Sequence, residues 1–324
     1  MNSEEKINLL GFTILIADNS TVARSIFSTY IRRAKGKAIT VTNGSDAISV
    51  LGSDKIDLLI TDIDIPEVSG FDLVTAAKES RPAIPSIIIT SAHIDEYINL
   101  AIEKDIGNIL SKEINEQSFV RTCYNLITGK NIFGLGHYLP DTREISSIKV
   151  DSSNQIQSVI QKVNDFGAGN GLHAAQIPFL AVILDEILSN AVYHAYGHTV
   201  EKENRAVVSL AVDEQVEVCY GNNDTHIGIS VTDYKGLLTK KKILSSFKNV
   251  IDQKKLIEES RKLNLDLIDH VSPSGMGLQM IRLMSNDYYF NIKRNSMTQV
   301  IALVNISEKA IVYHNSSIRI NELA

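Results

Sequence analysis

A short apolar run, LITDIDIPEVSG at 59–70, ends on a carboxylate at the point where a buried strand would end. Asp62 closes the run, and Asp64 stands two residues later, ahead of Pro66 and Gly70. A carboxylate at the end of a core strand costs free energy unless a cation or hydrogen bonds compensate its charge. We therefore expect other parts of the chain to supply that compensation.

Three other short apolar runs also end beside polar groups. Asp18 and Asn19 follow the first run, Thr90 closes another, and Lys112 follows the last. Clustered acids repel one another unless a divalent cation binds, and Mg²⁺ prefers one or two carboxylates with phosphate oxygens and water. A carboxylate beside Mg²⁺, with an amine and a hydroxyl near the phosphoryl oxygens, can attack phosphorus and form an aspartyl phosphate. These residue types predict a phosphoacceptor site.

Strand-like and helix-like patterns alternate through the segment that carries these residues. The predicted strands are 13–17, 38–41, 57–61, 86–90 and 107–111. Between them, apolar residues such as Val22, Ile26 and Tyr30 recur at the four-residue spacing of an amphipathic helix. This alternation predicts a parallel sheet with helices on both faces, whose ligands bind beyond the carboxyl ends of the strands. The polar groups stand at those ends.

Residues about 12–128 resemble the receiver domain of bacterial two-component response regulators, which has a flavodoxin-like, doubly wound sheet of five parallel strands. The resemblance implies that Asp62 is the phosphoacceptor, and that an upstream histidine kinase or phosphotransfer protein supplies the phosphoryl group. It implies further roles: metal-binding side chains at Asp18 and Asn19, a metal-binding carbonyl at Asp64, a switch hydroxyl at Thr90 and a phosphoryl-binding amine at Lys112. Ser91 is an alternative to Thr90 as the switch.

Three positions depart from the receiver pattern. Asn19 stands where the family usually has a second acid, so one negative charge is lost and weaker Mg²⁺ binding is expected. Glu113 replaces the proline after Lys112, which disfavours the usual cis peptide bond. Ile109 replaces the aromatic residue that commonly reports phosphorylation. We expect phosphorylation with a relay that differs from the common one.

The segment IPFLAVILDEILSNAVYHAYG at 177–197 carries a second set of polar residues. Its apolar residues recur at i, i+3, i+4 and i+7, which predicts a buried helix. Glu186, Asn190 and His194 recur every four residues on another side of that helix. An amide oxygen suits a Mg²⁺ already bound by triphosphate, and a carboxylate one turn earlier can orient water or accept a hydroxyl proton. Taken alone, the helix could equally present a solvated polar face.

Two glycine-containing segments favour a nucleotide site. HIGISVTDYKG at 226–236 is an alternating strand that ends in Asp233, with Gly236 close behind. Farther on, Gly275 and Gly277 precede an apolar helical stripe. Glycines at the start of a helix let backbone N–H groups approach phosphate, where the helix dipole also favours an anion.

In this order, the segments resemble the ATP-binding domain of the GHKL superfamily, and within it the anti-sigma-factor serine kinases. The similarity covers about 145–306 and implies an α/β sandwich, a mixed sheet with helices on one face. It implies these roles for residues: Glu186 as general base, Asn190 as Mg²⁺ ligand, Asp233 as acceptor from the adenine amino group, Gly236, Gly275 and Gly277 in the glycine boxes, and Thr298 before the last strand. The first glycine box departs from D-x-G-x-G, because only Gly236 is kept and it is out of register. The basic segment 239–263 is either a nucleotide lid or a helix with a solvated charged face.

The chain is thus expected to consist of a receiver domain (1–128), a linker (129–144), an ATP-binding domain (145–306) and a tail (307–324) without an assigned role. The linker is apolar enough to pack on a domain or a partner chain. A net charge of −6 without a strongly basic domain argues against nucleic-acid binding. No secretory pattern and no apolar run near the length of a membrane span is apparent, so a cytoplasmic location is expected.

Three functions are compared. The first is a receiver-gated, ATP-dependent kinase that phosphorylates Ser or Thr on an anti-sigma-factor antagonist. The second is a non-catalytic switch that sequesters a sigma factor or its antagonist, which the incomplete glycine box favours. A histidine autokinase is disfavoured, because no helical hairpin with a phosphoacceptor His precedes the ATP-binding part. The oligomeric state is left open, although relatives of both halves often form dimers.

Overall fold

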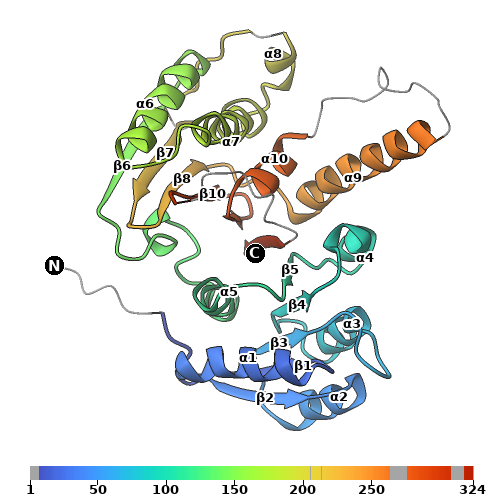
Figure 1. Ribbon diagram of the computed structural model, residues 1–324. Coiled ribbons are helices and arrows are strands. Elements are labelled where there is room, and N and C mark those ends of the chain that lie inside the picture. Colours follow the sequence, from blue (N-terminus) through green and yellow to red (C-terminus); the bar gives the residue numbers. More distant parts are fainter. Residues whose placement is uncertain (1–6, 205, 213, 263–275, 308–316, 324) are drawn as a thin grey trace. The chain divides into compact units, whose positions relative to one another are not determined.

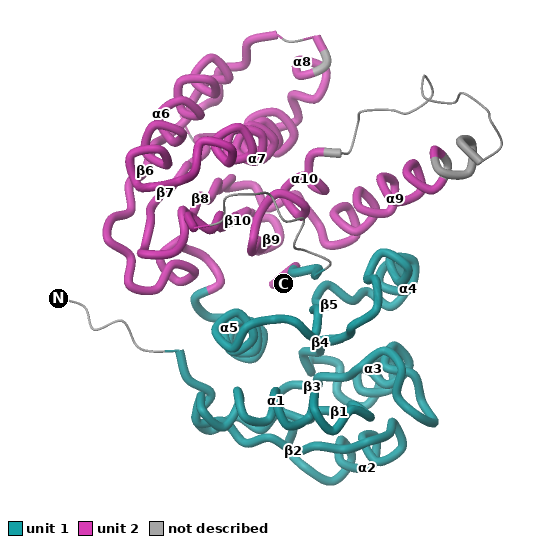
Figure 2. Tube along the Cα trace, viewed as in Figure 1, with its two compact units in different colours: residues 1–131, 316–319 teal, residues 132–315, 320–324 magenta. Residues whose placement is uncertain are grey.

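A computed structural model of the chain describes residues 7–204, 206–212, 214–262, 276–307 and 317–323. The chain forms two compact units (Figure 2). Unit 1 comprises Met1–Asn131 and Ser316–Arg319, and unit 2 comprises Ile132–Asn315 and Ile320–Ala324.

Unit 1 is built on a sheet of five parallel strands. In spatial order these are β2 (Lys37–Val41), β1 (Thr13–Ala17), β3 (Leu58–Thr61), β4 (Ser86–Thr90) and β5 (Asn108–Ser111). This order and direction are those of the predicted doubly wound, flavodoxin-like fold, and each predicted strand is found within one residue of its expected start.

Helices cover both faces of this sheet (Figure 1). Helices α1 (Thr21–Arg33) and α5 (Glu116–Thr128) pack together, and α2 (Gly44–Ser53) packs against α3 (Gly70–Ser80). The short helices η1 (Ile94–Tyr97) and α4 (Ile98–Glu103) lie between β4 and β5 in the chain. Successive residues of a strand point to opposite faces, so Ile14 and Ile16 join the core under α1 and α5 while Leu15 is buried on the other side.

Side-chain caps start four of these helices close to the carboxyl ends of the strands. The side chain of Ser20 accepts from the Ala23 N–H, that of Ser69 from Asp72 N–H, and Asn43 and Asn115 act likewise for α2 and α5. Each cap satisfies one of the N–H groups that a helix leaves open at its first turn. The loop that carries Asp18 is three residues long (18–20), whereas the loop that carries Asp62 runs over eight residues (62–69).

Unit 2 is built on a mixed sheet, as predicted. In spatial order its strands are residues 320–323 of β11 (Ile318–Leu323), β9 (Asp287–Lys293), β10 (Met297–Asn305), β8 (His226–Asp233), β7 (Val216–Asn222) and β6 (Glu144–Val150). All neighbours are antiparallel except β11 and β9, which are parallel. The first two residues of β11 pair instead with β5, in unit 1.

Five helices of unit 2 follow in chain order, after the short turn η3 (Ser153–Gln155): α6 (Ile156–Gly169), α7 (Ile177–Ser189), α8 (Thr199–Glu203), α9 (Lys240–Lys262) and α10 (Met276–Met284). Helix α7 packs against α6 and α10 and contacts β8 and β10. Among the described residues, Ile177–His194 is apolar enough over its 18 residues to be a candidate membrane span, which the sequence analysis did not expect. Its face formed by Leu180, Ile183, Leu184, Ile187 and Leu188 is buried inside unit 2, as in a core helix.

The segment predicted as a linker packs on unit 2. Around the turn η2 (Leu135–His137), the side chains of Leu135, Tyr138 and Leu139 pack against Tyr289, Ile301 and Leu303. Because Ile301 and Leu303 alternate with Val300 along β10, the linker and the helices lie on opposite faces of the sheet. The apolar side chains of the linker are thus explained by packing on a domain.

Candidate functional site

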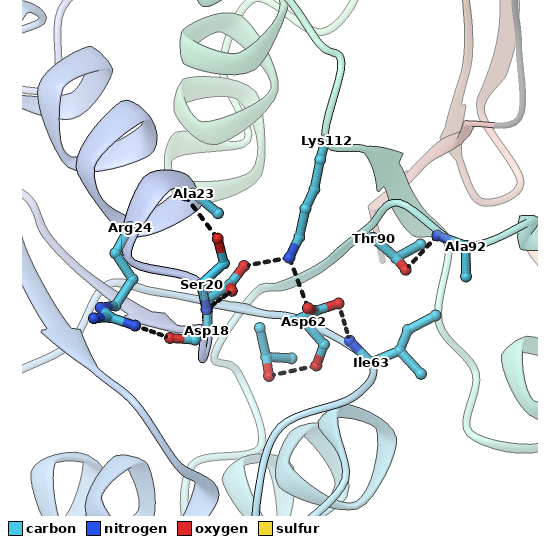
Figure 3. A network of polar contacts seen from close by, with 10 residues as sticks. Asp18, Ser20, Ala23, Arg24, Asp62, Ile63, Thr90, Ala92 and Lys112 are labelled. Atoms are coloured by element: carbon cyan, nitrogen blue, oxygen red, sulfur yellow. Dashed lines mark hydrogen bonds and ion pairs between the residues drawn. The ribbon is translucent and has the colours of Figure 1, made fainter.

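The structure brings three of the predicted receiver residues into one cluster at the carboxyl edge of the unit 1 sheet (Figure 3). Asp18 follows β1 and is fully buried, and Asp62 follows β3 and is 8% exposed. The Lys112 Nζ atom lies 2.8 Å from Asp18 Oδ2 and 2.6 Å from Asp62 Oδ2. The ammonium group is the cation that makes a carboxylate at the end of β3 tolerable.

The remaining oxygens of these two carboxylates bind backbone N–H groups. Asp18 Oδ1 accepts from the Ser20 N–H (2.8 Å), and Asp62 Oδ1 accepts from the Ile63 N–H (2.7 Å). Burial lowers the pKa of Lys112, but its hydrogen bonds to Asp18 and Asp62 and their charges outweigh burial and raise that pKa. The cluster therefore holds a fixed positive charge beside two carboxylates.

Gly70 allows the loop after Asp62 to fold back closely. The Gly70 N–H donates to the Ile63 carbonyl (2.9 Å), and a Cβ at Gly70 would lie 1.9 Å from the Asp62 backbone oxygen. Only glycine fits that approach, which explains the Gly70 that follows the two acids in the sequence.

The other predicted receiver residues surround this cluster in different environments. Thr90 ends β4 and is buried, and its hydroxyl accepts from the Ala92 N–H at 3.0 Å (Figure 3). Asn19 and Asp64 are exposed. Within the described ranges no group of three or more His, Cys, Asp or Glu side chains could hold a metal ion. Two carboxylates still fit Mg²⁺, which commonly takes one or two and completes its shell with phosphate oxygens and water.

Unit 2 contains a cavity of about 730 Å³ that brings together most of the residues predicted for ATP binding. Glu186, Asn190, Asp233, Gly277 and Thr298 all line it. Gly236 does not belong to the lining, and Gly275 lies outside the described residues.

Asp233 and Thr298 face each other across two paired strands. Asp233 ends β8, Thr298 begins β10, and the two are partners in the antiparallel register. Asp233 Oδ1 accepts from the N–H groups of Lys235 and Gly236, both at 3.0 Å. Burial raises the pKa of Asp233, while these two N–H groups and the Thr298 hydroxyl oppose the shift.

Gly236 has a structural task that explains why this glycine is kept. Its φ is +62°, and a Cβ would lie 2.3 Å from the Lys293 carbonyl oxygen and 2.6 Å from the Met297 nitrogen. The turn after β8 thus packs backbone to backbone on the β9–β10 turn.

Glu186 and Asn190 lie on successive turns at the end of α7. From Asn190 to His194 the helix widens to a π turn, in which the Ala195 N–H donates to the Asn190 carbonyl (3.2 Å). Such turns frequently occur at functional sites. Burial raises the pKa of Glu186, the charge of Lys202 lowers it, and the charge of Asp185 adds to the rise.

The first turn of α10 lies directly against the Glu186 carboxylate. A Cβ at Gly277 would lie 1.9 Å from Glu186 Oε2. The Glu186 carboxylate therefore occupies the space beside the Gly277 Cα, and any side chain at 277 would have to displace it.

Several residues that line the cavity were not among the predicted site residues. They are His194, Thr199, Lys202, Leu237, Leu238, Lys242 and Ser246. Lys242 belongs to the basic segment, which forms a helix with exposed charged residues, as one of the two alternatives had it, and the nucleotide lid stays a prediction. Helix α9 buries Ile243, Leu244 and Phe247, it presents Lys242 to the cavity, and Lys254 and Lys255 are exposed.

Lys202 also lines the cavity and was not predicted. It lies on a five-residue helix without apolar periodicity, so the sequence held no signal for it.

Comparison with known proteins gives two matching families. Residues 14–123 match the response regulator receiver domain, and residues 150–303 match the histidine kinase-like ATPase domain. The rice protein "Two-component response regulator ORR3" (Oryza sativa subsp. indica) is 32% identical over 117 residues, covering 35% of this chain and 89% of the relative. "Response regulator SaeR" of Staphylococcus aureus is 31% identical over 115 residues, 36% of this chain and 50% of the relative.

Solved structures similar to this chain also cover about a third of it. A response regulator receiver domain protein from Clostridium thermocellum is 21% identical and covers 37% of this chain and 98% of its own length, with a TM-score of 0.35. Chemotaxis protein CheY4 of Vibrio cholerae is 20% identical, covers 36% and 98%, and has a TM-score of 0.34. On its sequence, its strand order and these family matches, the chain belongs to the two-component response regulators, as a receiver domain followed by a histidine kinase-like, GHKL-type ATPase domain.

Proposed function

We propose that this response regulator is a receiver-gated protein kinase, in which phosphorylation of Asp62 controls transfer of a phosphoryl group from ATP to Ser or Thr of a partner protein. One observation carries the proposal: residues from four separate segments of the chain line one cavity, namely Glu186 with Asn190, Asp233, Gly277 and Thr298. A cavity of about 730 Å³ is within the size range of small-molecule sites.

In the receiver domain, Asp62 is the proposed nucleophile. Mg²⁺ would be held by Asp18, Asn19, Asp62 and the Asp64 carbonyl, and would neutralise phosphoryl oxygens. Lys112, already 2.6 Å from Asp62 Oδ2, is placed to bind one of those oxygens. The Thr90 hydroxyl, bonded to the Ala92 N–H, is the proposed switch group, which would exchange that bond for one to the phosphoryl group.

In the ATPase domain, ATP would supply the transferable phosphoryl group. Glu186 would accept the proton of the attacking hydroxyl, and its raised pKa favours that role because a base works best with a pKa near the working pH. Asn190 would hold Mg²⁺ without adding negative charge beside the triphosphate. Asp233 would accept from the adenine amino group, and Gly277, in the second glycine box, would let the backbone at the start of α10 approach phosphate.

The partners follow from the same proposal. The receiver domain requires an upstream phosphodonor, a histidine kinase or a phosphotransfer protein. Downstream, we propose an anti-sigma-factor antagonist as the protein that is phosphorylated, with the protein acting in the cytoplasm.

A second candidate function is a switch that binds ATP or a partner without turnover, sequestering a sigma factor or its antagonist. The position of Gly236 favours it, because the only glycine kept from the first glycine box packs on the β9–β10 turn instead of lining the cavity.

Titration of the full chain with ATP and Mg²⁺ tests the proposal, followed by measurement of phosphoryl transfer to a co-expressed antagonist. We expect binding by the wild type, weaker binding by Asp233→Asn, and transfer that is lost in Glu186→Gln while binding persists. Binding with equal, background transfer in the wild type and Glu186→Gln would support the second function. Absence of ATP binding would exclude the kinase.

A further inference from the structure

Lys202 reaches from α8 into the cavity and contacts the residue proposed to hold Mg²⁺. Its Nζ atom lies 3.3 Å from Asn190 Oδ1 and 3.3 Å from His194 Nε2. The side chain is half-buried and belongs to the cavity lining. No motif described above includes it.

The hydrogen bonds fix the direction of the contact with His194. An ammonium group can only donate, so His194 Nε2 accepts from Lys202 and the ring proton is on Nδ1. Nδ1 lies 3.2 Å from Thr199 Oγ1, which can accept it. A neutral His194 therefore holds the amine beside Asn190 without adding a second positive charge.

The short helix that carries Lys202 is fastened to the π turn. The His198 N–H donates to the Tyr193 carbonyl (2.7 Å), and the Tyr193 hydroxyl donates to the Ala206 carbonyl (3.3 Å). The residue before α8 and the segment after it are thus both tied to Tyr193, so the fold positions the backbone that carries the Lys202 side chain.

The charge of Lys202 acts on two neighbouring carboxylates, while its hydrogen bond is to Asn190. Glu186 and Asp185 lie close enough for Lys202 to lower the pKa of each carboxylate against the effect of burial. If Mg²⁺ binds Asn190 Oδ1, two cations compete for one amide oxygen, and the flexible ammonium is the one that can move. The polyphosphate chain held by that Mg²⁺ would then offer the ammonium group new acceptor oxygens.

We infer that Lys202 is a phosphate-binding residue of this site, whose ammonium group leaves Asn190 for the polyphosphate oxygens of a nucleotide bound with Mg²⁺. The inference rests on the proposed ATP site. It assigns the polyphosphate end of the cavity to the π turn and α8, with Asp233 at the adenine end.

Isothermal titration of the full chain with ATP and with adenosine, both in Mg²⁺, tests this assignment. Loss of a charge-assisted hydrogen bond predicts that Lys202→Gln weakens ATP binding by about tenfold to a hundredfold. Adenosine has no phosphate, so its affinity should be unchanged. Lys202→Arg keeps the charge and should retain most of the ATP affinity.

Lys248→Gln is a matched control, because Lys248 lies on α9, pairs with Asp252 and does not line the cavity. It should bind ATP like the wild type. Equal ATP affinity in Lys202→Gln and the wild type would overturn the inference, as would an equal loss for ATP and adenosine. Failure of the wild type to bind either compound would instead overturn the ATP site itself.

Discussion

Gln299 on β10 joins the linker to the sheet of the ATPase domain. Its Oε1 accepts from the Gly134 N–H at 2.7 Å, and its Nε2 donates to Thr232 Oγ1 on β8 at 2.9 Å. Thr298, the preceding residue, lines the cavity on the opposite face of the same strand. The linker is therefore fastened to the back of the strand pair whose front carries Asp233 and Thr298.

The first prediction concerns this fastening. Gln299→Leu removes a nearly buried amide and leaves the Gly134 N–H and the Thr232 hydroxyl without their partner. We expect the free energy of unfolding to fall by about 1–3 kcal/mol, the cost of buried polar groups left unsatisfied. Urea denaturation of the full chain would measure it. Gln157→Leu, on the exposed side of α6, is the control and should change it by less than about 0.5 kcal/mol. Equal effects of the two substitutions would contradict the expectation.

The second prediction identifies the phosphoacceptor. A small-molecule phosphodonor with Mg²⁺ should label the wild type, and Asp62→Ala should reduce the label to background, because Asp62 carries the carboxylate next to the Lys112 amine. Asp64→Asn is the matched control: its side chain is exposed, only its backbone carbonyl is proposed to bind metal, and labelling should persist. Intact-protein mass spectrometry would count the phosphoryl groups. Label retained in Asp62→Ala would show that another acid accepts the phosphoryl group.

The third prediction uses the close contact of α10 with Glu186. Gly277→Ala places a methyl group where Glu186 Oε2 now lies, so the carboxylate must move. We expect overpacking to lower the free energy of unfolding by about 1–3 kcal/mol. We also expect ATP turnover to fall, by a factor larger than the fraction of unfolded protein can explain. Gly169→Ala on α6 adds a methyl group that meets nothing within 4 Å, and should leave both unchanged or raise stability slightly. Wild-type turnover in Gly277→Ala would show that this contact is not needed.

The fourth prediction is a pH dependence. Burial raises the pKa of Glu186, so as the pH falls its carboxylate becomes protonated at a higher pH than that of an ordinary Glu. A base must be ionised to accept a proton, and kcat should therefore fall as the pH is lowered through this raised pKa. The charge of Lys202 opposes the shift, so in Lys202→Gln the acidic limb should move to higher pH. Profiles of kcat against pH at saturating ATP would test both statements. If the acidic limbs of the wild type and Lys202→Gln coincide, the expected effect of Lys202 is contradicted.

The sequence predicted the receiver domain well because its signals are local. Each strand is a short apolar run, and each polar group follows the strand that positions it, so spacing alone placed Asp18, Asp62 and Lys112 at one edge. The helix with Glu186 and Asn190 was predicted for the same reason, although the π turn after Ser189 was not. Its widening appears in backbone bonds such as that from the Ala195 N–H to the Asn190 carbonyl, which residue periodicity does not report.

What the sequence did not predict depends on contacts between distant segments. Strand β11 was missed because it is buried on both faces: Arg319 and Asn321 are as enclosed as Ile318 and Ile320, so apolar and polar residues do not mark an inside and an outside. The burial of the Asn321 amide is compensated by a hydrogen bond, in which its Nδ2 donates to Oδ1 of Asn291 at 2.8 Å, 30 residues earlier in the chain. Gly236 was expected to approach nucleotide, but the β9–β10 turn, not a ligand, is what demands a glycine there.

Strand β11 also constrains the order of events during synthesis. Ile318 and Arg319 pair with β5, and the four residues after them pair with β9. While the codons before 317 are being translated, the receiver domain has already left the ribosome with the edge of β5 unpaired, and such an edge attracts the strands of other chains. A chaperone that shields this edge would matter most in that interval, and slow translation of the last segment would lengthen it.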